Sequence, residues 1–290
     1  MAESIASPRA RGGPADMPRD LTQSRTVADT AVCAEPTEES LVDPGAPLPG
    51  MVVPLPRAHL RGRPIERCLV VTHVVQPGED LEELAERYLA PHVRPGDIAV
   101  VGQKVASVCQ GRCIPLAEVR VRALARLLSR TVRRTPHGLG LRRPETMEMA
   151  LREVGTWRIL YASLHGAWDR VKKRSGSFYR VAGSRVWAID GPGPETLAPY
   201  DRFIVLAPDD PDRLARQVAR RLGTGACIVD VNDLSAAVLG ASPGVDRRLV
   251  REALRDNPMG QGRAQTPLGL LRPLPATYRA SHTSRRPGAA

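Results

Sequence analysis

Between Cys68 and Pro273, short stretches of consecutive apolar residues alternate with stretches in which apolar residues recur every three or four positions. The first pattern is typical of buried strands and the second of amphipathic helices. Residues 98–102 predict a buried strand, for example, and residues 80–89 predict a helix with acidic residues in its first turn. Strands that alternate with helices predict an α/β or α+β domain, in which ligands bind at the carboxyl ends of strands.

The predicted elements divide the chain into three parts. Residues 1–66 are rich in proline, alanine, glycine, serine and charge without a sustained apolar period, so we predict a disordered N-terminal extension. Residues 67–273 form the predicted folded domain, and residues 274–290 a disordered tail. We expect strands at 68–75, 98–102, 186–190, 202–206, 226–230 and 268–272. We expect helices at 80–89, 120–131, 145–154, 209–222 and 246–255, and a hairpin or loop at 176–183.

Charge and composition disfavour two classes of partner. The net charge of +11 comes almost entirely from arginines spread along the chain, and aromatic residues make up only 3%, so no base-stacking basic stripe stands out. No apolar run reaches the ~18 residues that a membrane-spanning helix needs. The five cysteines are scattered, and the six histidines do not cluster as zinc ligands would. We therefore expect a cytoplasmic protein with reduced thiols that binds neither nucleic acid nor membranes.

Two of the predicted strands run directly into an aspartate. The strand 186–190 ends at Asp190, and the strand 226–230 ends at Asp230, with Asp233 close behind. Neighbouring parallel strands would bring such carboxylates together, and close carboxylates repel each other unless a cation lies between them. Oxygen ligands of this kind suit Mg²⁺ or Mn²⁺. The alternative is local, because aspartates at such positions also form Asx turns and helix caps.

Two further features favour an anionic ligand such as a nucleotide. Lys104 follows the strand 98–102 in a chain that otherwise uses arginine almost exclusively, and a compact ammonium reaches phosphate as a point charge. The turn Met259-Gly260-Gln261-Gly262 offers backbone N–H groups to a phosphate and the Gln261 amide oxygen to a cation. The alternatives are a chance lysine at a strand end and an ordinary glycine turn.

Several short motifs occur in a characteristic order along the chain. They are Pro95-Gly96-Asp97-Ile98 with Val100-Val101 and Gln103-Lys104, then Ser107 with Gln110-Gly111-Arg112, Ile189-Asp190, Pro208 with Pro211-Asp212, and Met259-Gly260-Gln261-Gly262 with Thr266-Pro267. In this order and spacing they resemble the coenzyme F(420):L-glutamate ligases, the gamma-glutamyl ligase family of the deazaflavin cofactor. The resemblance covers residues 68–273, and residues 135–150 look like those of a divergent, ligase-like branch.

The resemblance implies a mixed-sheet domain, a homodimer and an enzyme that uses GTP and divalent cations. In that family a substrate carboxylate is activated as an acyl phosphate, which the amino group of glutamate attacks to form an amide. Carried over, Asp190 and Asp230 match metal-binding aspartates, Gln261 matches an oxygen ligand, and Asp233 is a further candidate ligand. Lys104 and Asp190 are the expected catalytic residues. Nucleotide contacts are expected from Thr72, His73, Val74, Val75, Gln103, Lys104, Met259, Gly260 and Gly262.

Three positions depart from the family pattern. Val108 stands where the family usually has lysine, Gly193 where it has asparagine, and Val231 where it has threonine. From the retained aspartates we expect a ligase-like enzyme that joins a small carboxylate to an amino acid, with Mg²⁺ or Mn²⁺ as cofactor and GTP as co-substrate, ATP being the alternative. The competing expectation, which Val108 favours, is a ligase-derived binding or regulatory protein without turnover.

Overall fold

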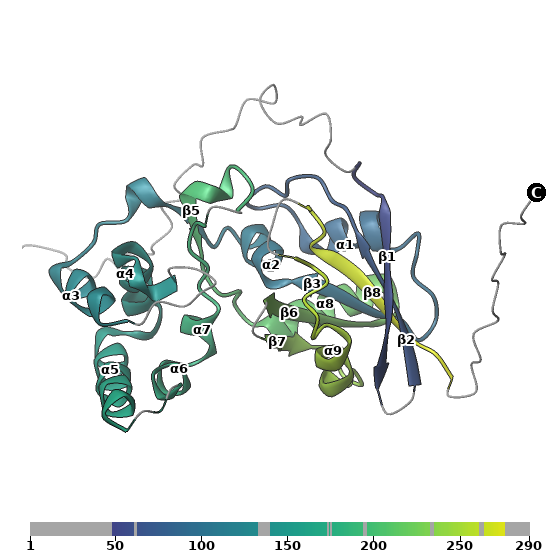
Figure 1. The fold of residues 1–290 in the computed structure, drawn as a ribbon. Coiled ribbons are helices and arrows are strands. Elements are labelled where there is room, and N and C mark those ends of the chain that lie inside the picture. The colour runs from purple at the N-terminus through teal and green to yellow at the C-terminus, as the bar shows by residue number, and fades with distance from the viewer. Residues whose placement is uncertain are drawn as a thin grey trace, which may run out of the picture. The chain divides into compact units, whose positions relative to one another are not determined.

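A six-stranded mixed sheet organises the domain, with strand order β1-β2-β8-β3-β6-β7 (Figure 1). The strands are β1 (Val52–Leu60), β2 (Arg63–Val70), β8 (Leu268–Pro273), β3 (Ile98–Gly102), β6 (Gly225–Asn232) and β7 (Ser235–Ala241). β3 and β6 are parallel, and the other neighbouring pairs are antiparallel. The computed structural model describes residues 48–60, 63–132, 140–172, 174, 176–193, 196–232, 235–260 and 264–275. The predicted α/β class is confirmed.

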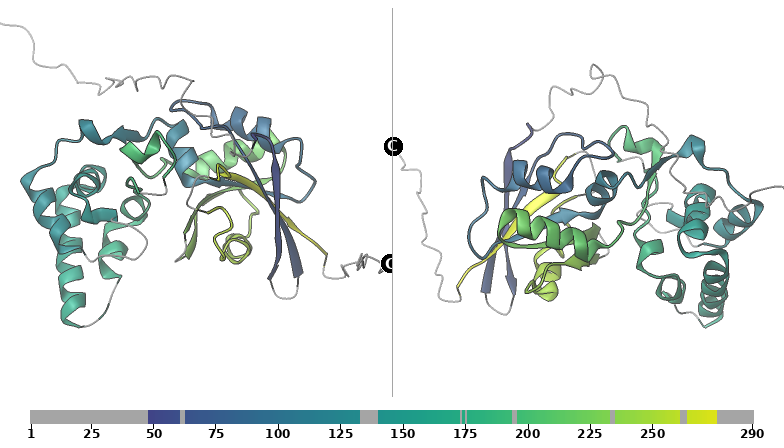
Figure 2. Two further views of the ribbon diagram at one scale, coloured as in Figure 1. Left: turned by 45° about the horizontal axis from the view of Figure 1, so that its top comes forward. Right: turned by 180° about the vertical axis from the view of Figure 1, so that it is seen from behind.

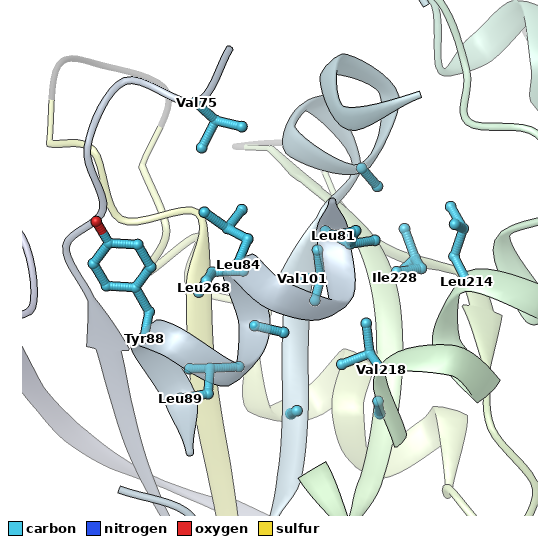
Figure 3. Close-up of a cluster of buried hydrophobic side chains, with 14 of the residues drawn as sticks. Val75, Leu81, Leu84, Tyr88, Leu89, Val101, Leu214, Val218, Ile228 and Leu268 are labelled. Atoms are coloured by element: carbon cyan, nitrogen blue, oxygen red, sulfur yellow. The ribbon is translucent and has the colours of Figure 1, made fainter. Parts of the chain in front are cut away.

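The two faces of this sheet enter different cores, because successive side chains of a strand point to opposite faces. Ala99 and Val101 of β3 join one core, and Ile98 and Val100 join the other. Helices α1 (Leu81–Leu89) and α8 (Pro211–Leu222) supply the first core, and α9 (Arg247–Ala253) supplies the second. Figure 3 shows the first core, in which Val101, Ile228 and Leu268 of the sheet meet Leu81, Leu84, Tyr88 and Leu89 of α1 and Leu214 and Val218 of α8.

Helices α1 and α8 begin and end where local sequence chemistry predicts. The Asp80 side chain caps α1 by accepting hydrogen bonds from the backbone N–H groups of Glu82 and Glu83. Asp210 caps α8 in the same manner, and Gly223 ends that helix with a left-handed φ of 66°, which glycine adopts without strain. The predicted helices at 80–89 and 209–222 are therefore confirmed.

The described residues between 123 and 187 form a group of helices with a core of their own (Figure 2). The helices are α3 (Ala123–Thr131), α4 (Pro144–Val154), α5 (Thr156–Val171), α6 (Ser177–Ala182) and α7 (Ser184–Trp187). Met147, Leu151 and Ile159 are among the most buried side chains of this core. The short helix α2 (Gln103–Cys109) leads from β3 toward a two-stranded sheet of β4 (Cys113–Pro115) and β5 (Phe203–Val205). Single 3-10 turns span Leu116–Glu118, Gly140–Arg142 and Tyr200–Arg202.

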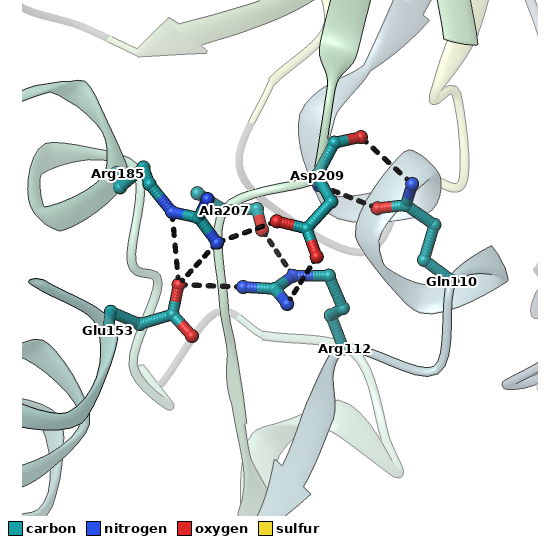
Figure 4. A network of polar contacts seen from close by, with 6 residues as sticks. All are labelled: Gln110, Arg112, Glu153, Arg185, Ala207 and Asp209. Atoms are coloured by element: carbon teal, nitrogen blue, oxygen red, sulfur yellow. Dashed lines mark hydrogen bonds and ion pairs between the residues drawn. The ribbon is translucent and has the colours of Figure 1, made fainter. Parts of the chain in front are cut away.

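A ring of alternating charges ties these helices to the strands (Figure 4). Arg112, next to β4, pairs with Glu153 of α4 at 2.7 Å and with Asp209 at 2.8 Å. Arg185 of α7 pairs with the same two acids, at 3.1 Å and 2.6 Å. Gln110 fixes the backbone of Asp209 beside the ring, because the two residues exchange two hydrogen bonds. Since each acid lies between two guanidinium groups, the four side chains hold one another in place.

The structure corrects the prediction for residues 176–190. The predicted hairpin or loop is helix α6, and the predicted strand 186–190 begins as helix α7. Gly176 and Gly183 flank α6 with φ values of 99° and 94°, and they act as helix boundaries instead of hairpin turns. Only Asp190 pairs as a strand residue would, through an isolated antiparallel bridge to Val205. A short apolar run fits a buried helix turn as well as a strand, which is why the prediction failed here.

The predicted disorder of residues 1–66 is wrong for its last part, where β1 and β2 form a hairpin. Three prolines lie in these strands, at positions 54, 56 and 64, and proline cannot donate to a ladder. β1 is an edge strand, however, and its register shifts between Leu55 and Ala58, around Pro56. Pro54 therefore lies on an edge strand, Pro56 at an irregularity and Pro64 at the start of β2, and a sheet accepts proline at such places. Residues 1–47 and 276–290 lie outside the described residues, so the rest of the predicted extension and most of the predicted tail are untested.

Candidate functional site

The site is built at the carboxyl ends of the parallel strands β3 and β6. Gly102, the last residue of β3, lies in register with Val229 of β6. Lys104 follows two residues beyond Gly102, in the first turn of α2, and Asp230 follows directly after Val229. The pairing of parallel neighbours therefore brings Lys104 and Asp230 to the same edge of the sheet. Asp230 pairs with Ala237 within a strand, which excludes the alternative that it forms a turn or a helix cap.

Asp190 is brought to this edge by a different segment, the chain that follows α7. Its backbone exchanges two hydrogen bonds with Val205 of β5, each 2.8 Å long, which fixes where its side chain starts. The Asp190 Oδ2 atom lies 2.5 Å from the Lys104 Nζ atom. The two side chains are 42% and 38% exposed, so a ligand in solvent can contact both.

The charges of Lys104 and Asp190 both shift the pKa of Asp230. The pKa of the Asp230 carboxyl is raised to about 6, first by burial and then by the nearby Asp190 carboxylate, while the Lys104 ammonium opposes the rise. A carboxyl group responds in this way only to charges that are close to it. Lys104 and Asp190 form an ion pair, and Asp230 therefore lies at the same edge of the sheet, within range of both charges.

The raised pKa predicts that ionised Asp230 lowers the free energy of unfolding of the metal-free protein. When a carboxyl has a higher pKa in the folded than in the unfolded state, the protein becomes less stable as the pH rises through that interval, here from about 4 to about 6. The variant Asp230→Asn carries no carboxyl at this position, so its stability should not fall in this way. We expect the variant to be more stable than the parent by about 1–2 kcal/mol at pH 7, discounted for partial exposure, and the gain to vanish below pH ~4.

Thermal melting with a chelator present, from pH 4 to pH 8, measures this difference, and Asp201→Asn serves as the control at an exposed aspartate. A variant that is less stable than the parent at pH 7, or a difference that does not change with pH, would contradict the coupling of Asp230 to its neighbours.

Helix α4 holds the segment that carries Asp190. A Cβ atom added to Gly191 would lie 2.9 Å from the Thr146 Oγ1 atom, so the segment approaches α4 closely only because residue 191 is glycine. The Arg143 guanidinium donates to the Pro192 carbonyl oxygen at 3.2 Å. Sequence reasoning did not identify Thr146 or Arg143 as supports of the site, since only the fold brings α4 beside residues 190–192.

The predicted nucleotide contacts at 72–75 form the connection that follows β2. The Thr72 and Val75 side chains are 1% and 5% exposed, so His73 and Val74 present the accessible side chains. The His73 imidazole lies 2.7 Å from the Tyr88 hydroxyl and 2.9 Å from a Glu79 carboxylate oxygen. Its orientation is thus fixed by Tyr88 and Glu79, two residues that the sequence did not connect with it.

The other predicted contacts lie around the end of β3. Gly102 donates its backbone N–H to the Pro267 carbonyl oxygen at 2.8 Å, and a Cβ at Gly102 would lie 3.5 Å from the terminal methyl of Met259. The Gln103 side chain is 7% exposed, and its Oε1 atom has no hydrogen-bond partner among the described residues. An acceptor in this state can take a hydrogen bond from a ligand. Gly260 is exposed.

Three predicted site residues, Asp233, Gln261 and Gly262, lie outside the described residues. Within the described part of the chain, no group of three or more histidine, cysteine, aspartate or glutamate side chains is placed to hold a metal ion. The predicted ligand set is therefore represented in the structure by its two aspartates, Asp190 and Asp230.

Two of the departures from the family pattern have a structural account. Val108 is 2% exposed and packs in the core between the sheet and helices α1 and α8. Val231 packs in the core beneath α9, on the opposite face of β6 from its neighbour Asp230. The apolar side chains at positions 108 and 231 therefore pack in hydrophobic cores. Gly193 meets only the Thr196 hydroxyl, at 3.6 Å from an added Cβ atom.

Comparison with known proteins gives the family of this chain. The family described as F420-0:gamma-glutamyl ligase matches residues 70–232, which is more than half of the 290-residue chain. The match contains Lys104, Asp190 and Asp230. The chain belongs to this family.

A curated relative of this family is similar to the chain over part of its length. The chain is 26% identical over 170 residues to a protein of Methanopyrus kandleri named coenzyme F420:L-glutamate ligase. The similarity covers 58% of this chain and 55% of that protein, so the chain spans about half the length of this relative. No described helix has both the length and the apolar character needed to cross a membrane.

Proposed function

We propose that the protein is a nucleotide- and divalent-metal-dependent ligase that forms an amide between a small carboxylic acid and an amino acid. The observation that carries the proposal is the convergence of Lys104, Asp190 and Asp230 at the carboxyl ends of β3 and β6. Membership of the gamma-glutamyl ligase family supports the class of reaction. GTP is the proposed co-substrate, with ATP as the alternative. A homodimer remains an expectation from the family resemblance.

The residues present fit a hard divalent cation. Two carboxylates lie near a single ammonium, and burial together with the Asp190 carboxylate raises the pKa of Asp230, which a bound cation would offset. Carboxylate oxygens are ligands that Mg²⁺ and Mn²⁺ prefer. When bound, such an ion would neutralise phosphate oxygens of the nucleotide. Asp190 has two oxygens, so one can remain paired with Lys104 while the other binds the ion.

In the proposed reaction a substrate carboxylate attacks the γ-phosphorus of the nucleotide, which gives an acyl phosphate and a nucleoside diphosphate. The amine of the amino acid then attacks the acyl carbon, expels phosphate and loses a proton as the amide forms. The Lys104 ammonium orients the transferred phosphoryl group and offsets its charge. Asp190 positions Lys104 through their 2.5 Å ion pair. The Gln103 Oε1 atom is an available acceptor for a donor group of the nucleotide.

A second candidate function is a ligase-derived binding protein that has lost turnover. The position of Val108 favours it, because the lysine that the family usually carries there is replaced by a buried core residue. Such a protein would bind nucleotide and metal but would not consume them.

Calorimetric titration of the full chain with GTP and with ATP, each with and without Mn²⁺, tests the proposal. We expect at least one nucleotide to bind, and to bind only when the metal is present. Binding of neither nucleotide, or binding that is the same without metal, would count against a metal–nucleotide site. Phosphate release and mass spectrometry with pairs of carboxylates and amino acids then separate the two candidates, since only the enzyme releases phosphate and forms an amide.

A further inference from the structure

The outer face of α5 exposes a row of large apolar side chains. The exposed fractions are 84% for Trp157, 58% for Tyr161, 69% for Leu164, 59% for Trp168 and 77% for Val171. Scattered apolar residues are normal on a protein surface, but a contiguous row of this size marks an interaction site. The nucleotide site makes no use of any of these residues.

The spacing of these residues identifies the kind of partner. They follow one another at intervals of four, three, four and three positions, which is the a/d spacing of a seam between paired helices. The opposite face of α5 is already used, because Ile159 and Ala162 are fully buried in the helical core. α5 therefore has two apolar faces, and the outer one has the pattern of a surface that receives another helix.

A groove runs beside this row, between α5 and α3. It has a volume of about 570 Å³. Leu160 and Leu164 of α5 line it together with Leu128 and Thr131 of α3. Leu127, at 60% exposure, adds an apolar side chain on α3. A groove between two helices that is lined by apolar side chains is the usual receptor for the apolar stripe of an amphipathic helix.

The helices beside the groove are basic. α3 carries Arg126 and Arg130, both exposed, and the Lys172 ammonium that follows α5 lies 4.9 Å from the centre of the Trp168 ring. The sequences of α3 and α5 contain one carboxylate, Asp169, which is buried and accepts hydrogen bonds from Ser177. The groove therefore presents positive charge that no exposed acid on these two helices offsets.

We propose that the groove between α3 and α5 binds an amphipathic helix of a partner protein whose apolar stripe is flanked by acidic residues. The heptad spacing selects a helix, and the basic rim selects acidic flanks. Six large side chains that are more than half exposed present an area of the order of the ~800 Å² per partner found in standard interfaces. A second copy of the chain fits less well, because it would bring two basic rims together.

The probe for this surface is a synthetic peptide of about three heptads with leucine at the a and d positions and glutamate at the flanking positions. Fluorescence anisotropy of the labelled peptide with the full chain should show saturable binding. A matched peptide with lysine in place of glutamate should bind at least about tenfold more weakly. Leu164→Glu should weaken binding of the glutamate peptide at least about tenfold, whereas Leu48→Glu, at a similarly exposed leucine outside the groove, should not.

Lys172→Glu provides a second variant that leaves the apolar row intact and should also weaken binding. Absence of binding, equal affinity for both peptides, or affinity unchanged in Leu164→Glu and Lys172→Glu would overturn the proposal. Two further measurements identify a different occupant if the peptide does not bind. Cosedimentation with vesicles of phosphatidylcholine and phosphatidylglycerol that Leu164→Glu abolishes would indicate a membrane surface. A dimer in analytical ultracentrifugation that Leu164→Glu abolishes would indicate a second copy of the chain.

Discussion

Asp190→Ala should abolish metal-dependent nucleotide binding. Asp190 supplies one of the two carboxylates at the site and holds the Lys104 ammonium at 2.5 Å. Its removal takes away a proposed metal ligand and the group that positions the phosphate contact. Loss of residues that only support a metal ligand commonly costs 10–100-fold in affinity, so loss of the ligand should cost at least about a hundredfold. Calorimetry with GTP and Mn²⁺ measures the effect.

The matched control is Asp201→Ala, at an exposed aspartate in a 3-10 turn of the same chain, which should bind like the parent. Asp230→Ala should match Asp190→Ala, and the double variant should be no worse than either, because two ligands of one ion do not act independently. Additive losses in the double variant would indicate two separate sites. Unchanged affinity in Asp190→Ala would remove Asp190 from the proposed mechanism.

Gly240→Ala should destabilise the domain strongly. Gly240 lies in β7 where the start of α8 crosses the strand, and a Cβ atom there would overlap backbone atoms of Pro211 and Asp212. Backbone cannot rotate away as a side chain can, so α8 would have to move off β6 and β7. We expect a loss of about 3 kcal/mol or more. For a domain of this size that lowers the melting temperature by about 6–12 °C.

Gly193→Ala is the matched control, because its added Cβ atom meets only the Thr196 hydroxyl, at an ordinary 3.6 Å. Its melting temperature should stay close to that of the parent. If the melting temperature of Gly240→Ala equals that of Gly193→Ala, then α8 does not approach β7 as closely as the structure places it.

The part of the site that could be predicted comes from local patterns that the fold preserves. The sequence shows the apolar runs of β3 and β6 and the polar residues at their ends. Parallel pairing of these strands then brings Lys104 and Asp230 to the same edge. Asp190 lies beside Lys104, but it does not reach this place in the predicted way. It was expected at the end of a strand, but it arrives from helix α7 through a single bridge to Val205.

What could not be predicted depends on contacts between distant segments. The hairpin of β1 and β2 was missed because its proline-containing sequence shows no sustained apolar period, and its pairing with β8 is a property of the assembled sheet. The support that α4 gives to Gly191 through Thr146 joins residues 45 positions apart in the sequence, and no local pattern signals it. Helix α5 was not predicted at all, because its two apolar faces blur the single stripe by which a surface helix is identified.

An anomalous difference map from crystals grown with Mn²⁺ and a non-hydrolysable GTP analogue tests the central claim most directly. The account predicts a manganese peak between the carboxylates of Asp190 and Asp230, with metal–oxygen distances of about 2.0–2.3 Å and the Lys104 ammonium on a phosphate oxygen. A nucleotide and metal bound elsewhere on the chain, with Asp190 and Asp230 contacting neither, would contradict it.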